Sequence, residues 1–295
     1  MRLINTLAYI LDHPLNKGRR FSTLSRFVWW QLKSRLSSSD IQYNWVNNAK
    51  ILASTGETGV TGNIYCGLHE FSDMGFLLHV LRPDDLFVDI GANVGSYTVL
   101  ASASIGAKTI CFEPIPLIYM RLISNIDVNN MAQKVTAYNV ALADTPGELT
   151  FSTDQNCMNH VIADHESSPA SVIVKVRTLD ECLKEAPFLI KIDVEGYEMP
   201  ALRGAVSTLS NQGLCAVILE LNGSGRRYGF DDAQISQLMF EYGFESYEYE
   251  PFKRQLTALK GKHSAHGNTL FLRDLESIQR RIDTASKVEV HGTIL

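Results

Sequence analysis

The stretch "VDIGANVGSY", residues 88–97, decides the fold. It continues the apolar run "LFVDI", residues 86–90, which is typical of a buried strand and carries the carboxylate Asp89 near its end. Gly91 and Gly95 follow, and "YTVLASASI" has the pattern of a helix. A strand, a glycine-rich turn and a helix in this order form a site for an anionic or nucleotide-bearing ligand.

The residues of the turn narrow the choice of ligand. A dinucleotide fingerprint would need glycines where the chain has Asn93 and Ser96, and the Gly-Lys-Ser/Thr end of a P-loop is absent. Asp89 would repel a phosphate but suits a cation such as an α-amino group. Glu113 ends the next predicted strand, 22 positions after Gly91, near the spacing of an acid that accepts hydrogen bonds from a ribose. A ribose with a cationic tail fits S-adenosylmethionine and does not fit NAD.

Helical and strand patterns alternate from about residue 75 onward. Strands are predicted in "KTICFE", "KVTAYNVAL", "SVIVKVRTL", "FLIKIDV", "LCAVILEL", "GFESYEYE" and "NTLFLR". Thr178 and Glu181 form a capping box that opens a short helix. Repeated βα units predict an α/β, doubly wound fold with a mostly parallel sheet and helices on both faces.

A second group of carboxylates lies in "LIKIDVEGYE", residues 189–198, where Asp193, Glu195 and Glu198 follow a buried strand. Three carboxylates within six residues are costly unless a cation or a proton satisfies them. They are candidates to bind the sulfonium-bearing donor, to act as base toward a hydroxyl acceptor, or to hold a divalent ion. Asp193 together with Glu220 and Asn222 offers the hard oxygen ligands of a Mg²⁺ site, so a divalent cation is an additional candidate cofactor.

Three further segments are candidates for contacts with the acceptor. His69 stands beside Glu70 just before the donor loop and is a candidate general base. The irregular stretch 153–170, with His160 and Glu166, is expected to overlie the site as a substrate-facing insertion. The loop "GSGRRYGF", residues 223–230, suits an anionic or sugar substrate.

Composition limits the class of protein. The 295 residues are 45% hydrophobic and 20% charged, as in soluble globular proteins, and the net charge of −5 argues against a nucleic-acid partner. We expect neither a spanning helix, since no apolar run of 18 residues exists, nor a secretory signal. Five scattered cysteines without C-x-x-C spacing predict reduced core thiols and a cytoplasmic location.

The N-terminal region has its own pattern. "FSTLSRFVWWQLKSRL", residues 21–36, predicts a basic amphipathic helix. Such a helix either packs on its own domain or on a sister subunit, which would make a homo-oligomer, or forms a weak contact with a membrane surface. Residues 50–67, rich in Gly and Thr, are expected to form a β-hairpin.

The motifs "FVDIGANVGSYTVLAS", "CFEPIP", "TLDECL" and "LIKIDVEGYEMPALRGA", in this order, resemble the FkbM family of S-adenosylmethionine-dependent methyltransferases. The resemblance covers roughly residues 63–250. It implies a class I methyltransferase, or Rossmann-like, fold with a seven-stranded sheet whose last strand is antiparallel. We expect an N-terminal helical extension over 1–40, the methyltransferase domain over 41–275, and a C-terminal helix and tail over 276–295.

The resemblance also implies an activity and a set of site residues. Methyl transfer to a hydroxyl of a sugar, glycolipid or secondary metabolite is the expected reaction, with a nitrogen or carboxylate acceptor, or a nucleotide-binding subunit without turnover, as alternatives. Asp193, Glu195 and His69 are the candidate catalytic residues. By position in the motifs, the donor would contact Asp89, Gly91, Asn93 and Gly95 with its methionine part, Glu113 with its ribose, and Asn139 to Ala141 with its adenine.

Overall fold

The structure is a computed structural model that describes residues 2–37, 39–54, 56–153, 159–163, 166, 168–265 and 268–295. Its centre is an eight-stranded sheet in the order β12-β11-β13-β10-β9-β3-β4-β5. The strands are β3 (Leu86–Ile90), β4 (Lys108–Phe112), β5 (Val135–Tyr138), β9 (Leu189–Ile192), β10 (Ala216–Glu220), β11 (Glu245–Glu250), β12 (Gln255–Ala258) and β13 (Asn268–Leu272).

The sheet confirms the predicted doubly wound fold. Strands β5, β4, β3, β9 and β10 are parallel neighbours, and the last long strand, β13, runs antiparallel between β10 and β11. These seven strands are the predicted sheet, and β12 adds an eighth at the edge through an antiparallel pair with β11. Every residue of β3 and β9 is buried because helices cover both faces, which explains their almost unbroken apolar sequence.

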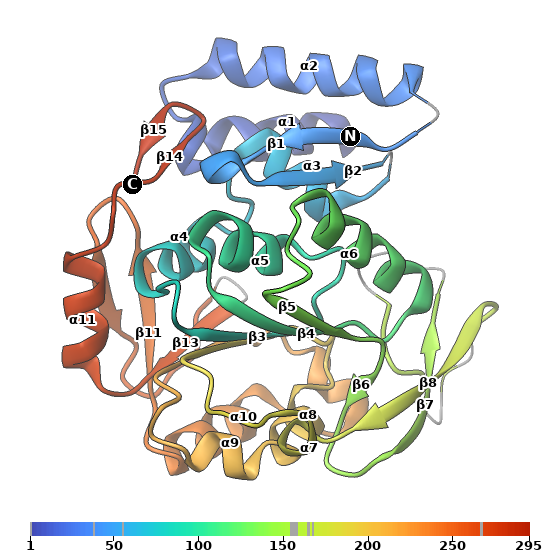
Figure 1. Ribbon diagram of the computed structural model, residues 1–295, viewed down its shortest axis with the longest axis vertical. Helices are drawn as coiled ribbons and strands as arrows, with labels where there is room; N and C mark the ends of the chain where they lie inside the picture. Colours follow the sequence, from blue (N-terminus) through green and yellow to red (C-terminus); the bar gives the residue numbers. More distant parts are fainter. Residues whose placement is uncertain are drawn as a thin grey trace.

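Helices form a layer on each side of the sheet (Figure 1). One layer holds α4 (Phe71–Val80), α5 (Ser96–Val99) with the π-helix Leu100–Ile105, α6 (Pro116–Val128) and α11 (Leu275–Asp283). The opposite layer holds α7 (Leu179–Cys182), α8 (Glu198–Arg203), α9 (Val206–Ser210) and α10 (Asp232–Glu241). The capping box of Thr178 and Glu181 is present at the start of α7, as predicted.

The N-terminal segment adds a further layer above α4 to α6 (Figure 1). It contains α1 (Arg2–Asp12), α2 (Arg20–Leu36), the hairpin of β1 (Ile41–Asn44) and β2 (Lys50–Ala53), and α3 (Thr58–Cys66). The prediction of a hairpin over 50–67 was therefore wrong for its second half, since Thr58–Cys66 is a helix. Its apolar residues Val60 and Ile64 are four apart and pack on α2, so tertiary packing outweighs the low helix propensity of the glycines.

Smaller elements complete the chain. A three-stranded sheet joins β6 (Ala141–Leu142), β8 (Ser171–Arg177) and β7 (Gly147–Ser152), so the predicted strand "SVIVKVRTL" lies outside the central sheet. The C-terminal hairpin of β14 (Glu289–Val290) and β15 (Thr293–Ile294) lies beside the N-terminal layer, where Arg19 donates to the carbonyls of His291 and Gly292. Within the described residues, no helix is both long and apolar enough to cross a membrane.

Candidate active site

A cavity of about 280 Å³ opens where β3, β4, β9 and β10 end. Both groups of acids predicted from the sequence contribute to its wall, because parallel strands bring their carboxyl ends to one edge of the sheet. Eight of the predicted site residues line it: His69, Asp89, Gly91, Asn93, Glu113, Ala141, Asp193 and Glu195. The other two, Gly95 and Asn139, are not among the lining residues.

Asp89 is 1% exposed and points out of β3 toward the helix that follows. Its Oδ2 accepts a hydrogen bond of 2.7 Å from the hydroxyl of Thr98, in α5. Burial raises the pKa of Asp89 above its ordinary value, while the nearby Lys191 ammonium works in the opposite direction. The carboxylate is thus held in place by the turn's own helix and faces the cavity.

Glu113 fastens two loops together. One carboxylate oxygen accepts the N–H of Asn93 at 3.0 Å and the other accepts the N–H of Ile115 at 2.9 Å. Burial raises the pKa of Glu113 to about 7. Because each oxygen keeps a second lone pair, the side chain still has capacity to accept from a ligand hydroxyl.

Each glycine of the turn stands where a side chain would not fit, and the obstacle differs between the two positions. Gly91 has φ +79°, and a Cβ there would lie 1.8 Å from the carbonyl oxygen of Asp193, so β3 and β9 approach too closely for a side chain. Gly95, at φ +93°, is the N-cap residue of α5, and a Cβ there would lie 2.6 Å from Leu122 Cδ1 of α6. At Gly91 the backbone of Asp193 occupies the space that a side chain would need, and at Gly95 the side chain of Leu122 does.

Asn139 acts on the loop rather than on the cavity. Its side-chain amide donates to the carbonyls of Glu113 and Pro114, at 2.8 and 2.9 Å. Ala141, two residues later, does line the cavity. Asn139 therefore supports the segment that follows Glu113.

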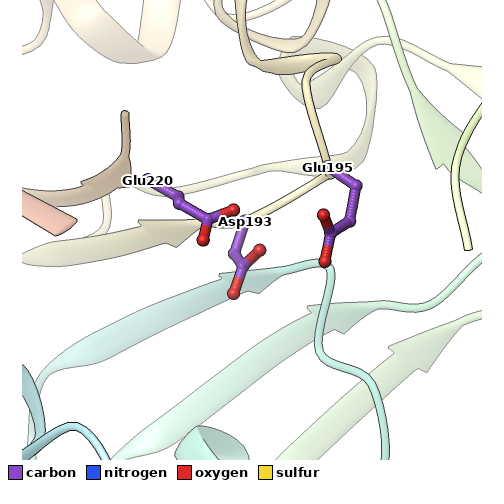
Figure 2. A group of neighbouring side chains, drawn as sticks. All are labelled: Asp193, Glu195 and Glu220. Carbon is purple, nitrogen blue, oxygen red and sulfur yellow. The ribbon is translucent and has the colours of Figure 1, made fainter. Parts of the chain in front are cut away.

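Asp193, Glu195 and Glu220 form a compact carboxylate cluster (Figure 2). One oxygen from each lies within 4.8 Å of the others. Asn222, expected from the sequence to be an oxygen ligand beside Asp193 and Glu220, does not line the cavity, and its Oδ1 accepts the N–H of Ser224 in its own loop. Glu195, in the turn after β9, supplies the third oxygen of the cluster.

Lys191 is the residue that sequence reasoning missed. It is 4% exposed in the middle of β9, and its Nζ lies 2.7 Å from Asp193 Oδ2 and 4.7 Å from the centre of the Tyr97 ring. In register it stands opposite Asp89 of β3. The sequence did contain a signal for this pairing. Lys191 stands two positions before Asp193 on an apolar strand, so the two side chains lie on the same face of the sheet.

The protonation states within the cluster differ. Burial opposes charge on Lys191, but the carboxylates of Asp193, Glu70 and Asp89 raise its pKa above the ordinary value. Burial would likewise raise the pKa of Asp193, and the Lys191 ammonium instead holds it below its usual value. Burial and the Asp193 carboxylate raise the pKa of Glu220 to about 9 and that of Glu195 to about 7. At neutral pH the lysine and Asp193 are ionised and Glu220 carries a proton.

Glu198, the third acid of the motif, is 1% exposed and supports the loop. Its Oε1 accepts the N–H of Val194 at 3.2 Å and of Gly196 at 3.1 Å. These bonds fix the turn that carries Glu195, whose φ is +55°. Glu198 thus positions Glu195 through the backbone.

His69 lies on the wall formed by the N-terminal layer. Its Nδ1 is 3.2 Å from the hydroxyl of Tyr9 in α1, and its backbone N–H donates to Asn63 of α3. Burial lowers the pKa of His69, so the ring is neutral at pH 7. Neighbouring Glu70 accepts a hydrogen bond of 2.5 Å from Tyr97. Helix α3, which the sequence did not predict, supplies Gly59, Val60 and Asn63 to the cavity.

Part of the predicted insertion 153–170 lies outside the described residues, including Cys157, Asp164 and His165. Of the rest, Asn159 lines the cavity. Glu166 pairs with His160 at 3.4 Å and with Arg227 at 3.0 Å, and Tyr228 donates to the carbonyl of Val161. The insertion and the loop 223–230 are therefore in contact.

Comparison with known proteins agrees with this architecture. A family model described as the methyltransferase FkbM domain matches residues 89–246. Hexuronic acid methyltransferase AglP of Haloferax volcanii is 28% identical over 170 residues, which cover 56% of this chain and 65% of that protein. The tRNA(Phe) (4-demethylwyosine(37)-C(7)) aminocarboxypropyltransferase of Pyrococcus horikoshii is 32% identical over 95 residues, 32% of this chain and 34% of that protein.

The chain thus spans less than two thirds of the length of each of these two relatives. Among solved structures, the FkbM methyltransferase of Methylobacillus flagellatus superposes with a TM-score of 0.44 and 17% identity, covering 65% of this chain and 44% of that one. The family model matches more than half of the residues and includes the glycine-rich turn and the carboxylate cluster. The chain therefore belongs to the FkbM family of S-adenosylmethionine-dependent methyltransferases.

Proposed function

We propose that the protein transfers a methyl group from S-adenosylmethionine to a hydroxyl of a saccharide-like acceptor. The observation that carries the proposal is the charge of the cavity. Six of its lining side chains are carboxylic acids, and Lys191 is the one Lys or Arg among its described lining residues. A wall of this kind favours a cationic donor and a neutral hydroxyl acceptor over a diphosphate.

The donor side follows the glycine-rich turn. Asp89 would meet the α-amino group, the backbone of Gly91 and Asn93 would enclose the methionine part, and Glu113 would accept from the ribose, with Ala141 beside the adenine. Gly95 and Asn139 would act indirectly, by holding α5 and the loop after Glu113. When bound, S-adenosylmethionine supplies an electrophilic methyl group on its sulfonium.

The acceptor side follows the carboxylate cluster. Glu195 is the proposed base, because a pKa of about 7 suits proton removal at neutral pH. Asp193, held by Lys191, would orient the acceptor hydroxyl, and protonated Glu220 can donate to it. His69 on the facing wall is the alternative base. That AglP is named a hexuronic acid methyltransferase supports a sugar-like acceptor for this chain.

The cluster also fits a divalent cation. Asp193, Glu195 and Glu220 offer hard oxygen donors close together, and Glu220 Oε2 is buried without a hydrogen-bond partner among the described residues. A cation held there would lower the pKa of an acceptor hydroxyl. If the cation is required, EDTA abolishes turnover and Mg²⁺ or Mn²⁺ restores it; turnover that survives EDTA assigns the proton transfer to a side-chain base, Glu195 or His69, without a cation.

Two measurements test the proposal. Isothermal titration should show binding of S-adenosylhomocysteine and none of NAD; tighter binding of NAD would reject the donor assignment. Release of S-adenosylhomocysteine should then depend on a hydroxyl acceptor such as a uronic acid glycoside, with one methyl group added to it by mass. Transfer only to amines or carboxylates would reject the oxygen acceptor, and no turnover with any acceptor would favour a binding subunit.

We also propose a reducing, cytoplasmic environment. Cys66, Cys111, Cys182 and Cys215 are buried free thiols, as expected for core residues of a protein in such a compartment.

A further inference from the structure

Helix α2 presents an apolar stripe to solvent. Phe21, Leu24, Val28, Leu32 and Leu36, spaced three or four apart, are 89%, 41%, 51%, 58% and 86% exposed. The helix does not need this stripe for its own packing, since its opposite face buries Thr23, Phe27 and Trp30. Apolar side chains lined up along one exposed helix face mark a contact surface.

The segment that carries the stripe has charges of one sign only. Residues 13–39 contain six Lys or Arg and no Asp or Glu, although the whole chain has a net charge of −5. Arg20, Lys33 and Arg35 of α2 are exposed, and the ammonium of Lys33 lies 4.9 Å from the centre of the Trp29 ring. An apolar stripe flanked by cations and an amphipathic aromatic side chain has the composition of an interfacial helix.

We propose that α2 binds to an anionic phospholipid surface, with the apolar stripe inserted among the acyl chains and the basic residues at the headgroups. Each basic residue near such a surface contributes favourably, so the charge complements the lipid. A second copy of the chain is a poorer occupant, because pairing two α2 faces would bring like charges together. A nucleic acid is also a poorer occupant, because its charged phosphate backbone offers no apolar surface to the stripe.

The position of α2 suits this role. It is the outermost element of the N-terminal layer, on the side away from the sheet (Figure 1). Its buried residues Phe27 and Trp30 pack with Val60 and Ile64 of α3, and α3 lines the cavity. Membrane binding through α2 would therefore place the lipid on the outer side of the layer whose α3 lines the cavity.

Co-sedimentation of the full chain with vesicles tests the proposal. We expect binding to vesicles of phosphatidylcholine with phosphatidylglycerol, and weaker binding to phosphatidylcholine alone. The double variant Phe21→Ser/Leu36→Ser and the triple variant Arg20→Gln/Lys33→Gln/Arg35→Gln should each reduce partitioning by about tenfold or more. Their melting temperatures should match that of the wild type, since all five side chains are exposed.

The matched control is Leu117→Ser/Ile173→Ser, which removes apolar side chains that are 79% and 66% exposed elsewhere and should leave partitioning unchanged. Three results would overturn the proposal: no binding of the wild type to anionic vesicles, binding that the α2 variants retain in full, or a solution dimer that the α2 variants dissociate while no vesicle binding occurs. The last result would assign the face to a second copy. None of these readouts depends on methyl transfer.

Discussion

Lys191 controls the charge balance of the cavity at the scale of single residues. It is a buried ammonium within 2.7 Å of Asp193 and in register with Asp89, so one cation offsets several acids. The ammonium lowers the pKa of Asp193, which is therefore ionised, while burial and the Asp193 carboxylate raise the pKa of Glu220, which is therefore protonated at neutral pH. The three carboxylates of the cluster are therefore not equivalent, and Glu195 alone has a pKa near neutrality.

The first prediction concerns pH. If Glu195 must be deprotonated to act as base, kcat should rise with pH through about 7 and level off above it. Glu195→Gln should lower kcat by about 10²–10⁴-fold and leave the affinity for S-adenosylhomocysteine unchanged. Initial rates measured across pH check kcat, and isothermal titration checks the affinity; a variant that keeps near-full turnover moves the assignment to His69.

The second prediction concerns Lys191. Lys191→Met keeps the length of the side chain but leaves Asp193 and Asp89 without their cation, so the free energy of unfolding should fall by about 3–5 kcal/mol. Urea denaturation followed by circular dichroism measures it. Lys175→Met, at an exposed position of β8, is the matched control and should change little. Equal stability of the two variants would show that the carboxylates do not need the ammonium.

The third prediction tests the donor side. Glu113→Ala removes the acceptor expected to bind the ribose hydroxyls and should weaken binding of S-adenosylhomocysteine by about 1–3 kcal/mol in isothermal titration. Glu148→Ala, at an exposed site on β7, should bind like the wild type. Unchanged affinity in Glu113→Ala would mean that Glu113 only fastens the loops of Asn93 and Ile115.

At the scale of elements, the junction between β3 and β9 determines the geometry of the site. Asp89 and Lys191 stand in register, and the chain leaving β3 at Gly91 touches the backbone of Asp193 leaving β9. The two acid clusters meet because these two strands are adjacent and parallel. A change at the contact should therefore affect both clusters.

The fourth prediction tests this contact. Gly91→Ala would place a Cβ 1.8 Å from the carbonyl oxygen of Asp193 in a backbone conformation with φ +79°, so we expect a loss of about 3 kcal/mol or more in stability. Gly147→Ala, in β7, has open space around the new methyl group and should be nearly neutral. Thermal unfolding of both variants decides whether the close approach is required.

At the scale of the whole molecule, the N-terminal layer is part of the site. Tyr9 of α1 contacts His69, and α3 lines the cavity. The core between α2, β2 and α3 holds this layer together through Phe27, Trp30, Ile51 and Ile64. Residues 2–36 therefore pack on their own chain through one face of α2, while the other face remains exposed.

The fifth prediction separates these two faces. Trp30 is 2% exposed in that core, so Trp30→Ala should cost about 3–5 kcal/mol of stability. Its neighbour Trp29 is 39% exposed, and Trp29→Ala should cost less than about 1 kcal/mol. Chemical denaturation followed by circular dichroism measures both losses, because each variant removes a tryptophan and so changes the fluorescence signal. Equal losses would contradict the packing of α2.

The sequence by itself determined the alternation of strands and helices from about residue 75 onward, the glycine-rich turn, and the two groups of acids at strand ends. These features depend on local periodicity and on the rule that parallel strands end at one edge, so "VDIGANVGSY" and "LIKIDVEGYE" were sufficient to predict them. The tertiary structure decided the rest. The register of Lys191 with Asp89, the approach of Glu220 to Asp193 and Glu195, and the role of α3 depend on which distant segments meet, and local patterns do not encode those contacts.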